Sequence, residues 1–182
     1  VAISPAQSST WSTLGAGLNG TVDVIEFGSA SDVYVAGGFT EAGGQAASRI
    51  AKWNGAAWET LTTGVDGAVF AMKFQGTDLF VGGAFTTAGG VTVNGIAKWN
   101  TVTSAWESLT TGVSGGASPR VFALEMIGSD LFVGGDFITA GGVTVNNIAK
   151  WDGSSWSPLG DGVDDPVRTL SKNSGVLYVG GY

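Results

Sequence analysis

The sequence contains no cysteine and no histidine among its 182 residues. Without cysteine it has no disulfides and no thiolate nucleophile. Without histidine it lacks the base of Ser-His-Asp and Cys-His systems and the usual zinc ligands. Basic residues are few as well: eight Lys and Arg stand against fifteen Asp and Glu, a net charge of -7. Because nucleic-acid binding needs clustered cations, we expect no nucleic-acid partner, and carboxylates remain the main reactive groups.

Long apolar runs are also missing. No stretch approaches the roughly 20 apolar residues of a membrane helix, and residues 1–11, "VAISPAQSSTW", lack the basic start and apolar segment of a signal peptide. We therefore expect no membrane insertion and no signal peptide within this segment. The acidic composition, rich in Gly, Thr and Ser, favours an exported bacterial protein in an extracellular or cell-surface location.

Glycine is abundant. The 31 glycines follow no three-residue period, and 43% apolar content with 13% charged residues is typical of a packed domain with many tight turns. A repeated phrase divides the chain at its tryptophans into units 11–57, 58–105 and 106–155 and a shortened unit 156–182. A period of 46 to 50 residues indicates a repeat architecture.

Each unit contains four short apolar segments separated by turn residues. In the second unit they are 69–74, 79–85, 96–99 and 106–109. Their length and their content of Val, Phe, Ile and Trp predict strands. Gly-containing turns such as "QGTD" and "NGAA" predict tight reversals. The unit therefore reads as a four-stranded antiparallel meander that must stack on copies of itself, which is the blade of an all-β, β-propeller fold.

The second predicted strand of each unit ends in small residues, mostly Gly-Gly, where another backbone must come close. This Gly-Gly strand, a loop and then "IAKW" resemble kelch-type propeller repeats. They are also similar to the Gly/Trp-rich propeller repeats of large bacterial and fungal surface proteins. The resemblance covers essentially the entire chain and implies a propeller, not an activity, because such blades carry unrelated functions. The copper site of galactose oxidase, which has kelch-like blades, needs His and Cys and is excluded.

The two ends of the chain correspond to complementary halves of a blade. We expect third and fourth strands at 1–14, blades at about 20–62, 67–110 and 120–160, and first and second strands at 166–182. Residues 1–182 would form one propeller domain or a half-propeller, with four blades' worth of strands and one blade split between the termini. The ring could close within one chain, giving four blades, or between two chains, giving a homodimer of eight. Alternatively, the chain is cut from a longer propeller.

Clustered carboxylates occur in "DGVDD", at Asp161, Asp164 and Asp165. They are candidate calcium ligands, because calcium prefers several oxygen atoms. Asp164 aligns with Asn19, Asp66 and Ser114 of the other units, which share an ability to stabilise turns. A turn-stabilising role, a calcium ligand and a catalytic carboxylate are the three interpretations. On the first strands, Glu26, Lys73, Glu125 and Ser171 share one equivalent position, where ion pairing and solvation are both open.

Two features could form a ligand surface. The long loops, residues 40–49, 86–95 and 138–147, should share one face with the connections between units. The polar residues on that face are Thr92, Asn94, Thr144, Asn146, Asn19, Asp66 and Asp164. The paired tryptophans of each unit, such as Trp99 and Trp106, would either pack within the blade or form exposed platforms for sugars.

No constellation is specific enough for an active site, and no cofactor is implied. The sequence favours a non-enzymatic binding or structural module of an exported protein. Its partners would be itself, through the terminal half-blades, or another protein or a glycan. The alternative is a glycan-binding lectin or a glycan-acting enzyme that uses the long-loop face.

Overall fold

The computed structural model describes residues 12–29, 31–116 and 118–181, and these form strands, turns and loops. The first four-stranded sheet is β1 (Val24–Phe27), β2 (Val33–Ala36), β5 (Ile50–Trp53) and β6 (Trp58–Thr60). The second is β7 (Ala68–Gln75), β8 (Asp78–Ala84), β11 (Ile96–Asn100) and β12 (Ala105–Ser108). The third is β14 (Arg120–Ile127), β15 (Asp130–Asp136), β18 (Ile148–Trp151) and β19 (Trp156–Pro158). A two-stranded sheet, β20 (Val167–Asn173) and β21 (Val176–Gly181), follows. All pairings are antiparallel between neighbours, which confirms the predicted all-β meanders.

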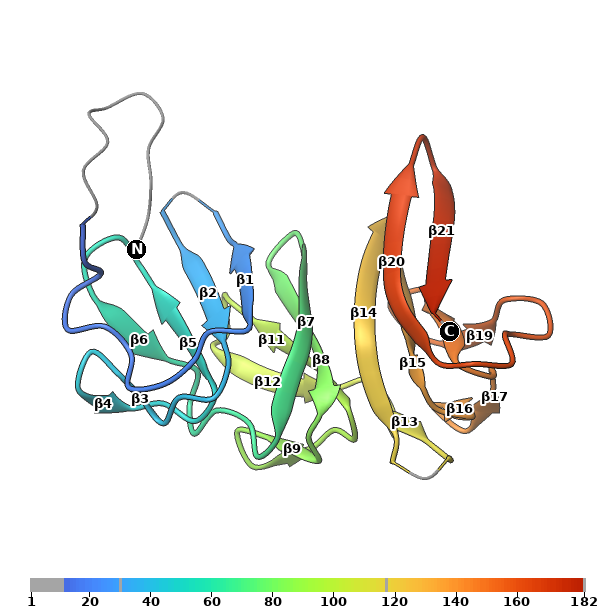
Figure 1. The fold of residues 1–182 in the computed structure, drawn as a ribbon, viewed down its shortest axis with the longest axis horizontal. Coiled ribbons are helices and arrows are strands. Elements are labelled where there is room, and N and C mark those ends of the chain that lie inside the picture. The colour runs from blue at the N-terminus through green and yellow to red at the C-terminus, as the bar shows by residue number, and fades with distance from the viewer. Residues whose placement is uncertain (1–11, 30, 117, 182) are drawn as a thin grey trace.

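The four sheets stand in a row in chain order, as propeller blades do (Figure 1). Their first strands, β1, β7, β14 and β20, contact one another in that sequence. The first sheet and the β20–β21 sheet lie at opposite ends of the row. The described residues therefore form an open row of blades. The strand predicted within residues 1–11, and Tyr182, lie outside the described residues.

Local turn chemistry shapes the blades. Between the third and fourth strands, Asn54 accepts hydrogen bonds at its Oδ1 from the amides of Ala56 and Ala57 at 2.9 and 2.8 Å. Asp152 does the same for two serines in the third sheet. The following glycines, Gly55 and Gly153, have φ of 95° and 102°, which favours glycine over any residue with a Cβ. These reversals confirm the predicted hairpins.

The core lies between neighbouring sheets, where large side chains of one strand fit against glycines of another. A Cβ on Gly82 of β8 would lie 2.5 Å from Cγ1 and 3.1 Å from Cβ of Val121 on β14. Gly134 of β15 stands in the same relation to Val167 of β20. Both valines are at most 1% exposed. The recurring glycine is therefore the point where the next blade packs, as the sequence predicted.

The tryptophan pairs pack within and between blades. The rings of Trp99 and Trp106 have centroids 5.3 Å apart, and each side chain is 6% exposed. The indole N–H of Trp106 also donates to the carbonyl oxygen of Leu61 in the preceding sheet, at 3.1 Å. Trp156 bonds in the same way to Leu109 at 3.2 Å. For these residues the packing interpretation is confirmed, because a buried ring offers no platform to a sugar.

Ion pairing and solvation were both open interpretations for the charged position on the first strands. At Glu125 the structure shows ion pairing, and this side chain is only 8% exposed. Its Oε1 lies 3.7 Å from Nζ of Lys73 and 3.6 Å from Nζ of Lys172, on the two neighbouring blades. The Glu125 carboxylate on β14 thus lies between the ammonium groups of Lys73 on β7 and Lys172 on β20. These ion pairs form only because the first strands of neighbouring blades lie close together.

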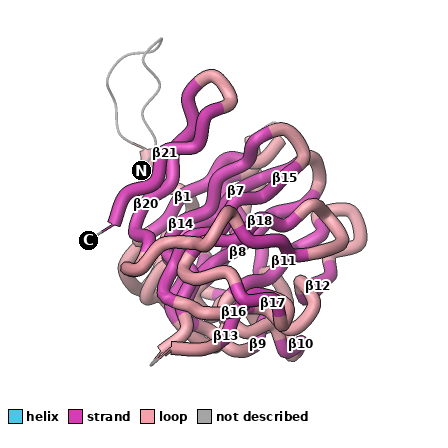
Figure 2. Tube along the Cα trace, turned by 90° about the vertical axis from the view of Figure 1, so that its right-hand side faces the viewer, coloured by secondary structure: helices cyan, strands magenta, loops and turns pink. Residues whose placement is uncertain are grey.

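The long loops differ from the sequence expectation, because each contains a small hairpin. These hairpins are β3 (Glu41–Ala42) with β4 (Gln45–Ala46), β9 (Thr87–Ala88) with β10 (Val91–Thr92), and β16 (Thr139–Ala140) with β17 (Val143–Thr144). In the third, β13 (Val113–Ser114) from the preceding connection adds a further strand. The small hairpins lie along one edge of the row in Figure 1, and Figure 2 shows β9, β10, β16 and β17 together on that edge.

Candidate binding surfaces

The connections between units hold the long loops in place. The carboxylate of Asp66 accepts hydrogen bonds from the amides of Thr86 and Thr87 at 2.8 and 2.9 Å, and from the Thr86 hydroxyl at 2.6 Å. Asn19 accepts from the amides of Thr40 and Glu41 at 2.8 and 2.9 Å. Burial alone would raise the pKa of Asp66, but the bonds from Thr86 and Thr87 outweigh it and lower the pKa below its ordinary value of 3.8.

The other polar residues of this face are placed on the same edge. Asn94 and Asn146 have φ near 50°, and their amide groups donate to the carbonyl oxygens of Thr111 and Asp161, both at 2.9 Å. Thr92 and Thr144 are exposed cross-strand partners in the small hairpins. The structure therefore gathers the predicted residues at one edge and uses most of their polar side chains within the fold. What this face binds stays a prediction.

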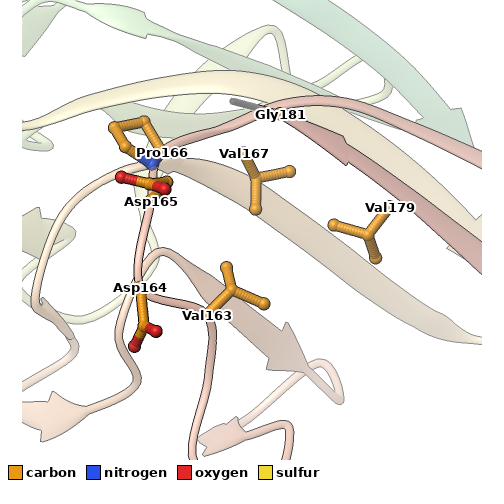
Figure 3. Close-up of a pocket in the computed structure, with 7 residues that line it drawn as sticks. All are labelled: Val163, Asp164, Asp165, Pro166, Val167, Val179 and Gly181. Atoms are coloured by element: carbon orange, nitrogen blue, oxygen red, sulfur yellow. The ribbon is translucent and has the colours of Figure 1, made fainter.

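The carboxylates of "DGVDD" do not converge. Asp164 and Asp165 line a cavity of about 280 Å³, and Figure 3 shows their carboxylates directed apart. In the described part of the chain, no three acidic, Cys or His side chains gather into a potential metal site. The calcium interpretation for Asp161, Asp164 and Asp165 therefore gains no geometric support from this arrangement.

The cavity beside Asp164 lies at the end of the row, against β20 and β21. Its apolar wall consists of Val163, Val167 and Val179, which point toward a common space in Figure 3. Val163 is 37% exposed and Val179 is 45% exposed. Their counterparts Val65 and Val81 in the second sheet are 2% and 0% exposed. The last blade thus leaves open a space that the complete blades fill.

The opposite end of the row also carries an uncovered apolar surface. Val22, Ile25 and Phe27 on and before β1 are 40%, 55% and 73% exposed. We call these three residues the leading face. A shallow cavity of about 210 Å³ lies beside it, lined in part by Leu14 and Trp58. The indole N–H of Trp58 donates to the carbonyl oxygen of Leu14 at 2.8 Å, as Trp106 does to Leu61.

A third cavity, of about 300 Å³, lies between the first and second sheets and includes Tyr34, Lys52 and Trp99 in its wall. The Lys52 ammonium lies 2.7 Å from the carboxylate of Glu59. Partial burial lowers the pKa of Lys52, but the bond to Glu59 and the neighbouring charges raise it above its ordinary value of 10.5. This lysine is therefore a stable cation in an ion pair rather than a proton-transfer group.

Comparison with known proteins supports the fold. No protein-family model and no curated protein matches the chain. One crystal structure, of the extracellular domain of the hybrid two-component system BT4673 from B. thetaiotaomicron, superposes with a TM-score of 0.57 and 14% identity over 88% of this chain and 19% of that one. A second crystal structure of this extracellular domain, in which BT4673 is described as a one-component system, superposes with a TM-score of 0.57 and 14% sequence identity. The match covers 92% of this chain and 20% of that one.

The chain spans about a fifth of the length of those extracellular domains. At 14% identity the likeness shows the fold alone. The class that fold and packing define is an all-β, propeller-like protein. Sequence reasoning located its repeats and predicted complementary half-blades at its two ends. It did not name the residues of the two end surfaces, because they appear only when each exposed residue is compared with its buried counterpart. The described residues contain no helix that could span a lipid bilayer.

Proposed function

We propose that the chain is a non-enzymatic propeller module of an exported bacterial protein, and that it binds through the two ends of its row of blades. Its likeness to an extracellular domain supports an extracellular location. The paired half-blades predicted from the sequence would complete the ring. The ends of the row are far apart in Figure 1, which favours closure between two chains, with eight blades, over a four-bladed ring.

One observation carries this proposal: the leading face is exposed, whereas its counterparts are buried at each internal junction. The counterparts of Val22 are Val69, Val121 and Val167, which are 2%, 0% and 1% exposed. The counterparts of Ile25 are Met72, Leu124 and Leu170, which are 5%, 6% and 8% exposed. In each case a preceding blade covers the side chain. The leading face is therefore shaped to receive the second strand of a blade.

The β20–β21 sheet offers such a strand. At the first junction, Phe74 packs edge-on against Tyr34 at a centroid distance of 5.1 Å. The corresponding residues at the closing junction are Phe27 and Tyr178, which are 73% and 56% exposed. Gly180 occupies the position of Gly82 and would receive Val22, as Gly82 receives Val121. A head-to-tail contact of this kind buries both apolar surfaces.

Mass measurement by light scattering tests the proposal. We expect the mass of two chains for the parent protein and of one chain for Ile25→Glu, because a buried carboxylate would face the partner's apolar strand. Val102→Glu is the matched control: Val102 is 75% exposed in a turn away from both ends, so this variant should keep the parent mass. A parent mass of one chain, or equal masses for both variants, would contradict closure between chains.

The alternative of a glycan-binding lectin or glycan-acting enzyme on the long-loop face stays a prediction. Asn94 and Asn146 would bind the sugar, although their amide groups already donate to backbone carbonyls. A glycan array probed with the parent and an Asn94→Ala/Asn146→Ala variant tests it. A signal that only the parent gives would support the alternative.

A further inference from the structure

The junction between the first and second sheets differs from the next junction in one buried side chain. Tyr34 lines the cavity of about 300 Å³ between these two sheets. Phe80 and Phe132 occupy the same position in the second and third sheets, and each of the three aromatic residues is paired with a lysine on the neighbouring strand. The blade therefore needs an aromatic ring at this position, whereas the hydroxyl group of Tyr34 is an addition that the blade does not need.

The Tyr34 hydroxyl opens onto the cavity. The residue is 1% exposed, and within the part of the chain that the structure describes no hydrogen bond reaches its oxygen. The described residues include no side-chain nitrogen or oxygen that is both sealed from solvent and unpartnered, so this oxygen is reached from the cavity that the ring lines. Burial raises the pKa of Tyr34 above its ordinary value of 10.0, and the carboxylates of Asp32 and Glu59 add to this effect while Lys52 opposes it. The hydroxyl is thus a neutral group that can still donate and accept a hydrogen bond.

The turn between β11 and β12 brings further hydroxyl groups to the same cavity. Six residues, 100–105, separate the paired tryptophans of the second sheet, whereas four separate those of the first and third sheets. Thr101 and Ser104 of this longer turn line the cavity. The amide and the hydroxyl of Thr101 both donate to the carbonyl oxygen of Thr77, at 2.9 and 2.8 Å, which anchors the turn. Ser104 is exposed, and no described residue bonds to its hydroxyl. The longer turn therefore presents a free hydroxyl on an anchored backbone.

The charged groups around the cavity do not suit an anion. Lys52 is the cation in its wall, and its Nζ lies 2.7 Å from the carboxylate of Glu59 and 3.7 Å from that of Asp32. A phosphate or carboxylate ligand would therefore meet two carboxylates and a lysine that is already paired. The Glu59 side chain is 45% exposed and the Lys52 side chain 22%, so both can still bond to a neutral hydroxyl group.

We propose that this cavity binds one neutral sugar ring, either as a free sugar or at the end of a glycan. The hydroxyls of Tyr34 and Ser104 and the ion pair of Lys52 and Glu59 would bond to the hydroxyl groups of the sugar. Trp99, which lines the cavity and is 6% exposed, would contact its C–H groups. A cavity of about 300 Å³ is at the small end of ligand pockets and suits one small ligand. The site lies between two complete blades, and its lining residues belong neither to the long loops nor to the leading face.

A sugar titration followed by NMR tests the inference. The probes are glucose, galactose, mannose and N-acetylglucosamine, each added to the 15N-labelled chain. We expect saturable shifts of the amide signals of Leu61, Thr62 and Ser104, which line the cavity, with at least one of these sugars. The methyl glycoside of that sugar should bind equally well if the natural ligand is the end of a glycan, and weakly if it is the free sugar. Both results support the site, whereas the absence of saturable shifts with all four sugars would overturn it.

Three variants identify the groups that bind. Tyr34→Phe should weaken binding about tenfold, the effect of one lost hydrogen bond, with an unchanged unfolding midpoint, because Phe80 and Phe132 fill this position in the other sheets. Ser104→Ala should weaken binding by a similar factor. Thr103→Ala is the matched control and should bind as the parent does, because Thr103 is exposed in the same turn but does not line the cavity. A Tyr34→Phe variant with the parent's affinity, or equal losses in Ser104→Ala and Thr103→Ala, would overturn the proposal. Sugar binding and the mass of the protein in solution are independent results, because the site needs no second chain.

Discussion

Replacing Gly82 with alanine would place a methyl group where the next blade already sits. The new Cβ would lie 2.5 Å from Cγ1 of Val121, whereas two carbon atoms in contact prefer about 3.5–4.0 Å. Gly82 does not have a left-handed φ, so the strain is steric. Because β8 is hydrogen-bonded to β7 and to β11, its backbone has little freedom to move away. Overpacking of this kind costs about 1–3 kcal/mol in the free energy of unfolding.

A double-mutant cycle with Val121 isolates the contact. Val121→Ala alone removes two buried methyl groups and should cost about 2 kcal/mol. The combined variant should cost little more than Val121→Ala, since the alanine at 82 then occupies space that the valine has left. The expected coupling is about 1–2 kcal/mol. Guanidinium unfolding followed by the fluorescence of the seven tryptophans measures each value.

The first sheet supplies the control. Ala36 stands at the position of Gly82 and is fully buried, so Ala36→Gly should destabilise the protein by about 1 kcal/mol through lost burial and added backbone freedom. A methyl group should thus stabilise the folded protein at position 36 and destabilise it at position 82. If Gly82→Ala were neutral, or if its effect simply added to that of Val121→Ala, the glycine would not be the contact point between blades.

Three further predictions concern the loops, the aromatic pairs and pH. Asp66→Ala should lower stability by about 1–2 kcal/mol in chemical unfolding, whereas Asp66→Asn should cost much less, because Asn19 makes the same backbone bonds in the first blade. Trp106→Ala should cost about 3–5 kcal/mol in the same assay, since the ring is 6% exposed, and Val102→Ala should cost almost nothing. The folded-state pKa values of Glu59, Asp66 and Asp152 are lowered, so the stability they contribute is complete above about pH 4.5 and is lost at lower pH. Melting temperatures should therefore fall between pH 5 and pH 2.5, and an unchanged melting temperature would contradict these bonds.

Much of the fold could be predicted because its signals are local. A Gly with positive φ after Asn54 or Asp152 fixes a hairpin within four residues, and short segments rich in Val, Phe, Ile and Trp predict the strands on either side. Repetition then shows that the same unit recurs. The candidate site was harder, because its contacts join distant segments: Asp66 reaches Thr86 across 20 residues, and Trp106 reaches Leu61 across 45.

The sequence by itself determined the repeating blade, the absence of cysteine and histidine chemistry, and the edge on which the long loops gather. Only the tertiary structure decided which surfaces remain uncovered. Ile25 and Met72 are equivalent in the repeat, yet one is 55% exposed and the other 5% exposed. The difference arises because burial depends on the neighbouring blade and not on the residue. For the same reason the sequence could list Asp164 as a turn residue or a candidate calcium ligand, but it could not show that Val163 and Asp164 line a cavity at the end of the row.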